Sequence, residues 1–163
     1  FSYNLASKSP EMKIAGKTVW ITGASSGIGE ALTYALNKRN CKLIISSRRQ
    51  DELERVKSNC PNQDKVHIIR LDLSACDDMP DIVEQATSQF GPIDVLVNNA
   101  GLSQRSLIAE TKFDVYKKLM DVNYLGTVAL TKALLPHFMK NQKFGKMHRL
   151  YFGLTKIHRL FYF

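Results

Sequence analysis

The sequence has few cysteines, no apolar run long enough to span a bilayer, and no acidic residue after Asp121. Without a long apolar run, no transmembrane helix is expected within these 163 residues. The three cysteines, Cys41, Cys60 and Cys76, are an odd number and lack the spacing of metal ligands. We therefore expect reduced thiols, with neither a disulfide framework nor a metal site.

The net charge of +8 is unevenly distributed. Of the 23 basic residues, five lie from Lys143 onward, where no acidic residue follows, so 18 basic residues face 15 acidic ones in the rest of the chain. The basicity is thus a property of the C-terminal segment, and the body carries no electrostatic footprint for nucleic acid. The length and an apolar fraction of 44% fit one globular domain of ordinary size.

A glycine-rich stretch, residues 22–29, lies between a short apolar run and a segment with apolar residues at helical spacing. This order indicates a strand, a tight turn and a helix start. Gly23 can adopt a positive φ, Gly27 can let the backbone approach a pyrophosphate, and Gly29 can let the helix pack on the strand. Three glycines also suit a turn without a ligand, but the flanking strand and helix favour dinucleotide binding.

Two hydroxyl groups follow the first glycine of this stretch. Ser25 and Ser26 add donors where the free N–H groups and the dipole of a helix already favour an anion. Together with Gly23 and Ile28, they are predicted to contact the pyrophosphate and ribose of a bound dinucleotide.

Apolar runs and helical patterns alternate along the rest of the chain. Strands are expected at residues 17–21, 42–47, 66–71 and 93–97, and helices at residues 30–38, 48–57, about 79–90 and about 114–137. We expect Ser74 to cap the turn before the third helix and Gly126 to break the fourth. The alternation predicts an α/β fold with a doubly wound parallel sheet and right-handed crossovers.

The end of the second expected strand bears on the cofactor. Ligands of such sheets bind beyond the carboxyl ends of the strands, and an acid at this end would accept from a ribose 2′-hydroxyl. The sequence has Ser47, Arg48 and Arg49 there, with no acid before Asp51. Guanidinium groups suit a 2′-phosphate, so NADP(H) is predicted over NAD(H). The alternative is a pair of solvated arginines at a helix start.

Polar residues also follow the third and fourth strands. Asp72 can accept from an adenine amino group beside Leu73, and it can equally cap the following turn. The amides of Asn98 and Asn99 need partners at a buried strand end, and we expect them to hold neighbouring strands and the cofactor ribose. Asn123 lies within an apolar helix, either with its amide in use or as a back-bonded, partly exposed side chain.

Residues 22–29 and 98–101 resemble the two signatures of the short-chain dehydrogenase/reductase family, and the similarity covers about residues 16–146. The resemblance implies a Rossmann-like fold with strand order 3-2-1-4-5-6-7, here truncated after about the fourth or fifth strand. It implies NADP(H)-dependent oxidation or reduction of small alcohols or carbonyls, such as retinoids and steroids. Asn98, Ala100 and Gly101 would then lie along the adenosine ribose and toward the nicotinamide, and Asn123 would hold a backbone carbonyl and a water in the proton relay.

The chain departs from the family pattern at its C-terminal end. The family requires a serine and a Tyr-x-x-x-Lys motif, and it opens its fifth strand with a Gly-Lys pair, which Gly145 and Lys146 match. Seven residues after the glycine stands Phe152 instead of serine, and the tyrosine would fall near or beyond Phe163. We therefore expect a chain that binds the cofactor but is inactive. The alternatives are a non-catalytic binding or regulatory isoform, and a truncated product that does not fold stably.

These observations divide the chain into three parts. Residues 1–15 are a lead-in, residues 16–145 are the NADP(H)-binding domain, and residues 146–163 are a divergent basic and aromatic tail. The tail is either a segment for an anionic membrane surface or a terminus not selected with the domain. The resemblance further implies a possible homo-oligomer and membrane association at the endoplasmic reticulum, with the cytoplasm as the alternative location.

Overall fold

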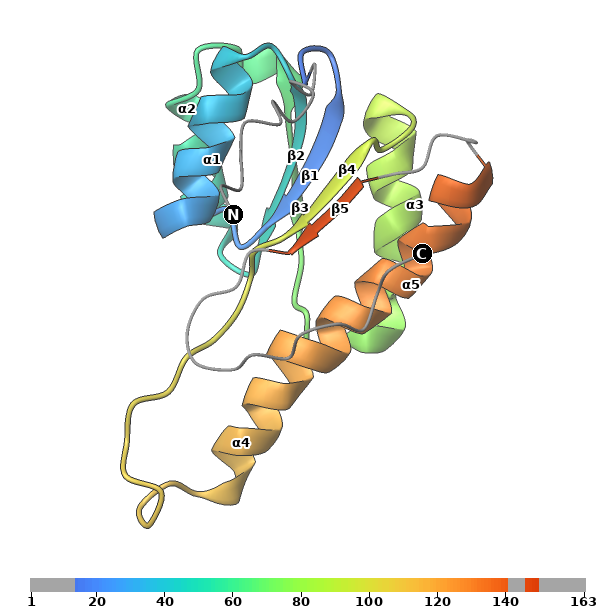
Figure 1. The fold of residues 1–163 in the computed structure, drawn as a ribbon. Helices are drawn as coiled ribbons and strands as arrows, with labels where there is room; N and C mark the ends of the chain where they lie inside the picture. Colours follow the sequence, from blue (N-terminus) through green and yellow to red (C-terminus); the bar gives the residue numbers. More distant parts are fainter. Residues whose placement is uncertain (1–13, 141–145, 150–163) are drawn as a thin grey trace, which may run out of the picture.

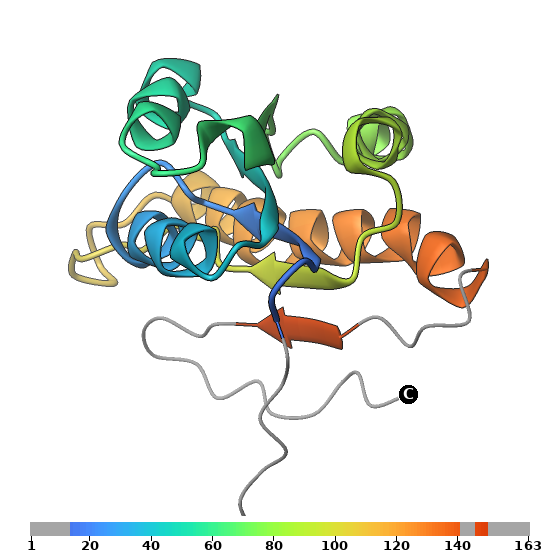
Figure 2. The same cartoon turned by 90° about the horizontal axis from the view of Figure 1, so that it is seen from above.

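The computed structural model describes residues 14–140 and the backbone of a strand at residues 146–149. Its centre is a five-stranded parallel sheet in the order β3-β2-β1-β4-β5, with helices on both faces (Figures 1 and 2). This is the expected α/β, Rossmann-like architecture, and the described residues contribute five strands to it. Most of the predicted lead-in and of the tail lies outside the described residues.

The strands are short, and four of the five contain three apolar residues each, as expected for a parallel sheet covered on both faces. They are β1 (Thr18–Thr22), β2 (Lys42–Ser47), β3 (Val66–Arg70), β4 (Val95–Asn98) and β5 (Lys146–Arg149). All five residues of β1 and all four of β4 are buried. Each expected strand is confirmed, although β4 begins two residues later than the sequence pattern indicates.

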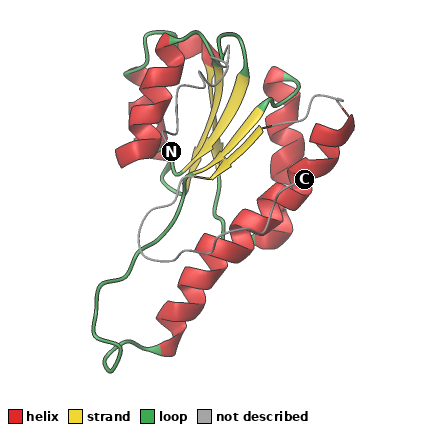
Figure 3. Cartoon of the chain, viewed as in Figure 1, coloured by secondary structure: helices red, strands yellow, loops and turns green. Residues whose placement is uncertain are grey.

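Helices alternate with the strands, as the ribbon coloured by secondary structure shows (Figure 3). They are α1 (Gly27–Lys38), α2 (Gln50–Ser58), α3 (Met79–Phe90), α4 (Phe113–Met120) and α5 (Thr127–Lys140), with short 3₁₀ turns at Gln63–Lys65 and Cys76–Asp78. Helices α1 and α2 cover one face of the sheet, and α3 and α5 cover the other (Figure 1). Helix α4 and the loop before it extend away from the sheet.

Each face of the sheet has its own apolar core. On the α1/α2 face, Leu36, Leu53 and Val56 pack against β-strand side chains, and on the other face Met79 and Leu130 belong to the second core. One pair of polar side chains is buried between β1 and β2. The indole Nε1 of Trp20, on β1, donates to Ser46 Oγ, on β2, at 2.8 Å, so the fully buried tryptophan has its donor satisfied.

The amino end of the sheet is held by one carboxylate. Asp94 precedes β4, and its two oxygens accept from the Thr18 backbone N–H and from Lys17 Nζ, both at 2.9 Å. These contacts fix β4 beside β1 at the end opposite the glycine turn. They therefore set the register in which the carboxyl ends of the two strands meet.

Two sequence-based details are wrong. The helix predicted for residues 114–137 has no break at Gly126, because residues Asp121–Gly126 form a π-helical turn that joins α4 to α5. Gly126 instead permits close packing, since a Cβ there would lie 2.0 Å from the Leu73 carbonyl oxygen. The cap of the turn before α3 is Asp72 rather than Ser74, because Asp72 Oδ1 accepts from both the backbone N–H and the hydroxyl of Ser74.

Stability should depend on the protonation of His137. The backbone N–H of Ile93, just before β4, donates to His137 Nε2 at 3.2 Å, and burial lowers the pKa of this histidine from its ordinary value. A lowered pKa in the folded chain means that its contribution is present above about pH 6.5 and is lost as the pH falls through the folded value. The free energy of unfolding, measured by urea denaturation, should therefore be lower at pH 5.5 than at pH 7.5 because of this residue.

His137→Gln separates this contribution from that of other groups. Its amide oxygen can accept from Ile93 without titrating, so the variant should lose less stability between pH 7.5 and 5.5 than the parent chain. His67, whose pKa burial also lowers, titrates in both proteins and cancels in the comparison. Equal losses in the two proteins would contradict the assignment.

Candidate functional site

The glycine turn connects the carboxyl end of β1 to α1. Gly23 has φ +68°, and a Cβ on it would lie 2.7 Å from Ala100 Cα, after β4. A Cβ on Gly29 would lie 2.3 Å from the Gly23 carbonyl oxygen and 2.6 Å from Asn99 Nδ2. Real Cβ atoms do not approach that closely, so both positions require glycine. The turn-forming role of Gly23 and the packing role of Gly29 are confirmed.

The middle glycine of the turn, Gly27, faces open space. Gly27 has φ +60°, and no heavy atom lies within 4 Å of the position that a Cβ would take. It is the first residue of α1, and the preceding Ser26 makes no side-chain cap hydrogen bond. The N-terminal N–H groups of α1 therefore lie beside a bare backbone, which is the arrangement that a pyrophosphate needs for close approach.

The ends of β1 and β4 are fastened together by an amide and a hydroxyl. Asn99 Nδ2 donates to the carbonyl oxygens of Thr22 and Gly23 at 3.0 and 3.2 Å. Thr22 Oγ1 accepts from the backbone N–H groups of Asn99 and Ala100, both at 3.1 Å. The expectation that this asparagine pair holds neighbouring strands is confirmed for Asn99.

Asn98 lies toward the other face of the sheet. Its Nδ2 donates to Thr131 Oγ1, on α5, at 3.4 Å, and the residue is only 5% exposed. Among the described residues, its buried Oδ1 has no hydrogen-bond partner. Leaving such an acceptor unsatisfied costs about 1–3 kcal/mol, so Asn98 is the one sequence-predicted position where a polar group still requires a donor in this part of the structure.

Asn123 makes hydrogen bonds through both ends of its side-chain amide. Its Oδ1 accepts from the Leu102 backbone N–H at 2.7 Å, and its Nδ2 donates to the Leu102 carbonyl oxygen at 2.8 Å. A Cβ on Gly101 would lie 3.2 Å from Asn123 Oδ1. The amide thus fixes the loop that follows β4, and it does so from the π-helical turn, a type of irregularity that is frequent at functional sites. Of the two interpretations of Asn123, the one with its amide in use is confirmed.

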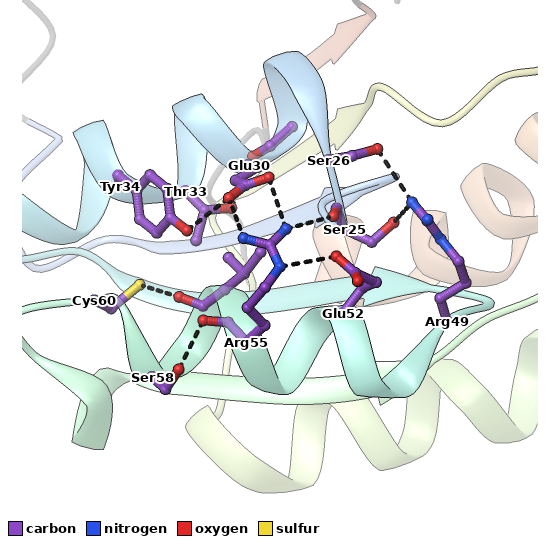
Figure 4. A network of polar contacts seen from close by, with 12 residues as sticks. Ser25, Ser26, Glu30, Thr33, Tyr34, Arg49, Glu52, Arg55, Ser58 and Cys60 are labelled. Carbon is purple, nitrogen blue, oxygen red and sulfur yellow. Dashed lines mark hydrogen bonds and ion pairs between the residues drawn. The ribbon is translucent and has the colours of Figure 1, made fainter.

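The second strand brings an arginine over the glycine turn. Arg49 Nη2 lies 3.2 Å from both Ser25 Oγ and Ser26 Oγ (Figure 4). Ser47 Oγ fixes the backbone of Arg49, accepting from its N–H at 3.1 Å and donating to its carbonyl oxygen at 3.2 Å. Four of the sequence-predicted residues, from two separate stretches, are therefore brought together at one edge of the sheet.

A further arginine at this edge was missed by the sequence analysis. Arg70 ends β3 opposite Ser47 in the strand register, and its Nε donates to the Arg48 carbonyl oxygen at 3.4 Å. The Arg48 side chain is exposed and contributes to lowering the pKa of Asp72, a shift caused mainly by the hydrogen bond from the Ser74 backbone. The sequence did contain a signal for Arg70, because a basic residue stands where the apolar pattern of the third strand stops.

The two residues predicted at the adenine have unequal exposure. Asp72 is exposed, and its capping role is confirmed by the two contacts from Ser74. Leu73 is 5% exposed and belongs to the core beneath α3 and α5. An exposed carboxylate is free to accept a further donor from a ligand, whereas Leu73 offers little side-chain surface.

Arg55, on α2, is a second residue whose importance the sequence did not indicate. Its guanidinium contacts Glu30, Glu52 and the Ser25 carbonyl oxygen (Figure 4). The charged pattern of this helix predicts salt bridges on its solvated face. It does not predict that one of its arginines would contact the glycine turn.

A parallel sheet in this strand order, with a glycine turn and an open helix start after its first strand, defines a nucleotide-binding domain of the Rossmann type. The chain belongs to the short-chain dehydrogenase family, whose family model matches residues 17–147. This confirms the resemblance stated from the two signatures and makes the chain a member of an oxidoreductase family.

Two relatives show how far the similarity extends. The human protein named Dehydrogenase/reductase SDR family member 7 is 46% identical over 143 residues, which are 85% of this chain and 42% of the relative. The protein of Sesamum indicum named 11-beta-hydroxysteroid dehydrogenase A is 38% identical over 134 residues, 80% of this chain and 38% of the relative. The chain thus spans less than half the length of these curated relatives.

Solved structures agree with the fold. A short-chain type dehydrogenase/reductase from Mycobacterium marinum has a TM-score of 0.78 at 25% identity, covering 83% of this chain and 56% of that one. The 3-ketoacyl-(acyl-carrier-protein) reductase from Brucella melitensis, solved in complex with NADH, has a TM-score of 0.73 at 33% identity, covering 78% and 52%. Within the described part of the chain, no helix is long and apolar enough to cross a membrane.

The glycines of the turn should differ in what they tolerate. Gly29→Ala places a Cβ against the Gly23 carbonyl and Asn99, so we expect a loss of more than about 3 kcal/mol in the free energy of unfolding. Gly27→Ala has room for the methyl group and suffers only the cost of a positive φ, about 1–2 kcal/mol. Urea denaturation of both variants measures the difference, and equal losses would contradict the packing role of Gly29.

Proposed function

We propose that this chain is the NADP(H)-binding part of a short-chain oxidoreductase. The observation that carries the proposal is the contact of the Arg49 guanidinium with the hydroxyls of Ser25 and Ser26. It joins the end of β2, where a dinucleotide's 2′ substituent is read, to the turn that lies against its pyrophosphate.

This cluster is composed of donors. A guanidinium has no acceptor, so the two serine oxygens must accept from Arg49, and their hydroxyl hydrogens remain available to donate elsewhere. Among the described residues, no carboxylate is paired with Arg49. A site of cationic and neutral donors suits the dianionic 2′-phosphate of NADP(H), and the described partners of Arg49 include no carboxylate to accept from a 2′-hydroxyl.

The remaining predicted residues complete a path for the cofactor. In the proposal, Gly27 and Ile28 lie along the pyrophosphate, Asp72 and Leu73 lie at the adenine, and Arg48 and Ser47 assist Arg49. The path then follows the end of β4, at Asn98, Ala100 and Gly101, toward the nicotinamide. When bound, the nicotinamide supplies hydride transfer, and Asn123 holds the Leu102 backbone in place beside that path.

The proposed reaction is the interconversion of alcohols and carbonyls, with retinoid- or steroid-like substrates. Similarity to proteins named Dehydrogenase/reductase SDR family member 7 and 11-beta-hydroxysteroid dehydrogenase A supports this class. Because the 163 residues place Phe152 where the family serine is expected and hold no Tyr-x-x-x-Lys motif after it, we propose that this chain by itself binds the cofactor without turnover. A homo-oligomer and an endoplasmic reticulum location are proposed from the family resemblance alone.

A charge reversal at Arg49 tests the cofactor preference. Arg49→Asp removes a charge-assisted donor and adds a repelling carboxylate, so the Kd for NADPH should rise about 10- to 100-fold. The Kd for NADH should change less than about threefold, since it has no 2′-phosphate. Quenching and enhancement of nicotinamide fluorescence measure both constants.

Arg39→Asp is the matched control, because it makes the same charge change at the exposed C-terminal end of α1, away from the glycine turn. It should leave both constants within about threefold of the parent values. An unchanged preference for NADPH in Arg49→Asp would overturn the assignment of this arginine.

Binding without turnover gives a second test. NADPH at 100 times its Kd should stabilise the folded chain by about 2.7 kcal/mol, which is a rise in Tm of about 5–10 °C for a chain of this size. Absorbance of NADPH with retinal or a steroid ketone should decay no faster than in buffer. A flat Tm would refute cofactor binding, and turnover above the buffer rate would refute the inactivity and also exclude a purely regulatory isoform.

A further inference from the structure

Arg55 makes a network of contacts that extends from α2 to the glycine turn (Figure 4). Its Nη1 and Nη2 pair with the two oxygens of Glu30 at 2.8 and 3.0 Å, and its Nε donates to Glu52 at 2.8 Å. Nη2 also donates to the Ser25 carbonyl oxygen at 3.3 Å. Three elements, α1, α2 and the turn, are therefore joined by one planar guanidinium, a geometry that a lysine ammonium cannot reproduce.

The network bears on anion binding at the start of α1 because it includes the carboxylate of Glu30. It lies in the first turn of α1, the helix that begins at Gly27. A carboxylate there would repel a pyrophosphate at the same helix end. Arg55, chiefly, and the Tyr34 hydroxyl at 2.8 Å lower the pKa of Glu30, so it stays ionised at neutral pH and is compensated by the ion pair rather than by a proton.

The contact with Ser25 orients a backbone donor. In a trans peptide the C=O and the following N–H point in opposite directions, and no peptide bond of the described chain is cis. Because Arg55 fixes the Ser25 carbonyl toward α2, the Ser26 N–H points away from α2. Ser25 is then held at its carbonyl by Arg55 and at its hydroxyl by Arg49.

We propose that Arg55 is a positioning residue for the dinucleotide pyrophosphate, which acts by compensating the Glu30 charge and by orienting the Ser25–Ser26 peptide. The proposal rests on the proposed function and adds a role distinct from that of Arg49. Arg49 faces the 2′ substituent and separates NADPH from NADH, whereas Arg55 acts on the part that both dinucleotides share.

Methionine at position 55 keeps an unbranched apolar stem about as long as the arginine methylenes and removes the guanidinium with its charge. In Arg55→Met, the Kd values for NADPH and for NADH should both rise, each by about tenfold, with their ratio unchanged. Lys57→Met is the matched control, because it removes one cation from the same helix, and it should change neither Kd by more than about twofold.

The double variant Glu30→Gln/Arg55→Met divides the two effects. Removing the uncompensated carboxylate should recover part of the lost affinity, and the deficit that remains measures the orientation of the Ser25 carbonyl. A structural role alone predicts that affinity follows Tm across the variants, without recovery in the double variant. Arg55→Lys retains the charge, so its Kd values should fall between those of the parent chain and Arg55→Met.

The free chain provides a readout independent of dinucleotide binding. In ¹H–¹⁵N spectra, the Ser26 amide should shift in Arg55→Met and stay in place in Lys57→Met. If the parent chain bound neither dinucleotide, the proposed function would fall, and this shift alone would decide whether Arg55 orients the turn. Kd values and a Ser26 amide in Arg55→Met that match those of Lys57→Met would overturn the proposal.

Discussion

The site depends on the close approach of three backbone segments at the carboxyl ends of β1 and β4. The turn at Gly23 contacts Ala100, and Gly29 contacts the Gly23 carbonyl so closely that neither position has room for a methyl group. The Asn99 amide and the Thr22 hydroxyl hold the segments in that arrangement. Because the first turn of α1 is seated by these contacts, its free N–H groups are positioned before any ligand arrives, and binding an anion there requires little reorganisation.

Features that depend on local chemistry were predictable from the sequence. The apolar runs define the strands, and the glycine spacing after the first run predicts both the positive φ of Gly23 and the packing of Gly29, because these follow from the turn itself. Features set by distant contacts were not predictable. Gly126 was expected to break a helix, yet it is constrained by the Leu73 carbonyl, more than fifty residues earlier. The sequence offered both Asp72 and Ser74 as caps of the turn before α3, and only the contacts of the Ser74 N–H and hydroxyl with Asp72 Oδ1 decide between them.

The roles of the arginines at the site were likewise not predictable from the sequence, because distant contacts set them. The sequence places several cations after β2 and on α2, but it does not say which of them meets a carboxylate. In the structure, Arg55 is occupied by Glu30 and Glu52, whereas Arg49 contacts only neutral hydroxyls among the described residues. An ion-paired guanidinium has little remaining attraction for a phosphate, and one on neutral oxygens keeps its charge available. The groups that an arginine contacts, rather than the number of arginines nearby, therefore decide whether its charge is available to a phosphate.

The glycine turn and helix α4 differ in how far the described residues enclose them. The glycine turn, the arginine cluster and the Asn123 clamp are built from contacts within the described residues. Helix α4 differs, since it has no buried residue and exposes Phe113 and Met120 by 72% and 51%. The matched regions are only 42% and 38% of the two relatives named above, and α4 presents an apolar face without a buried residue. In the proposed function, the dinucleotide would therefore be bound by a region whose contacts the described residues already make among themselves.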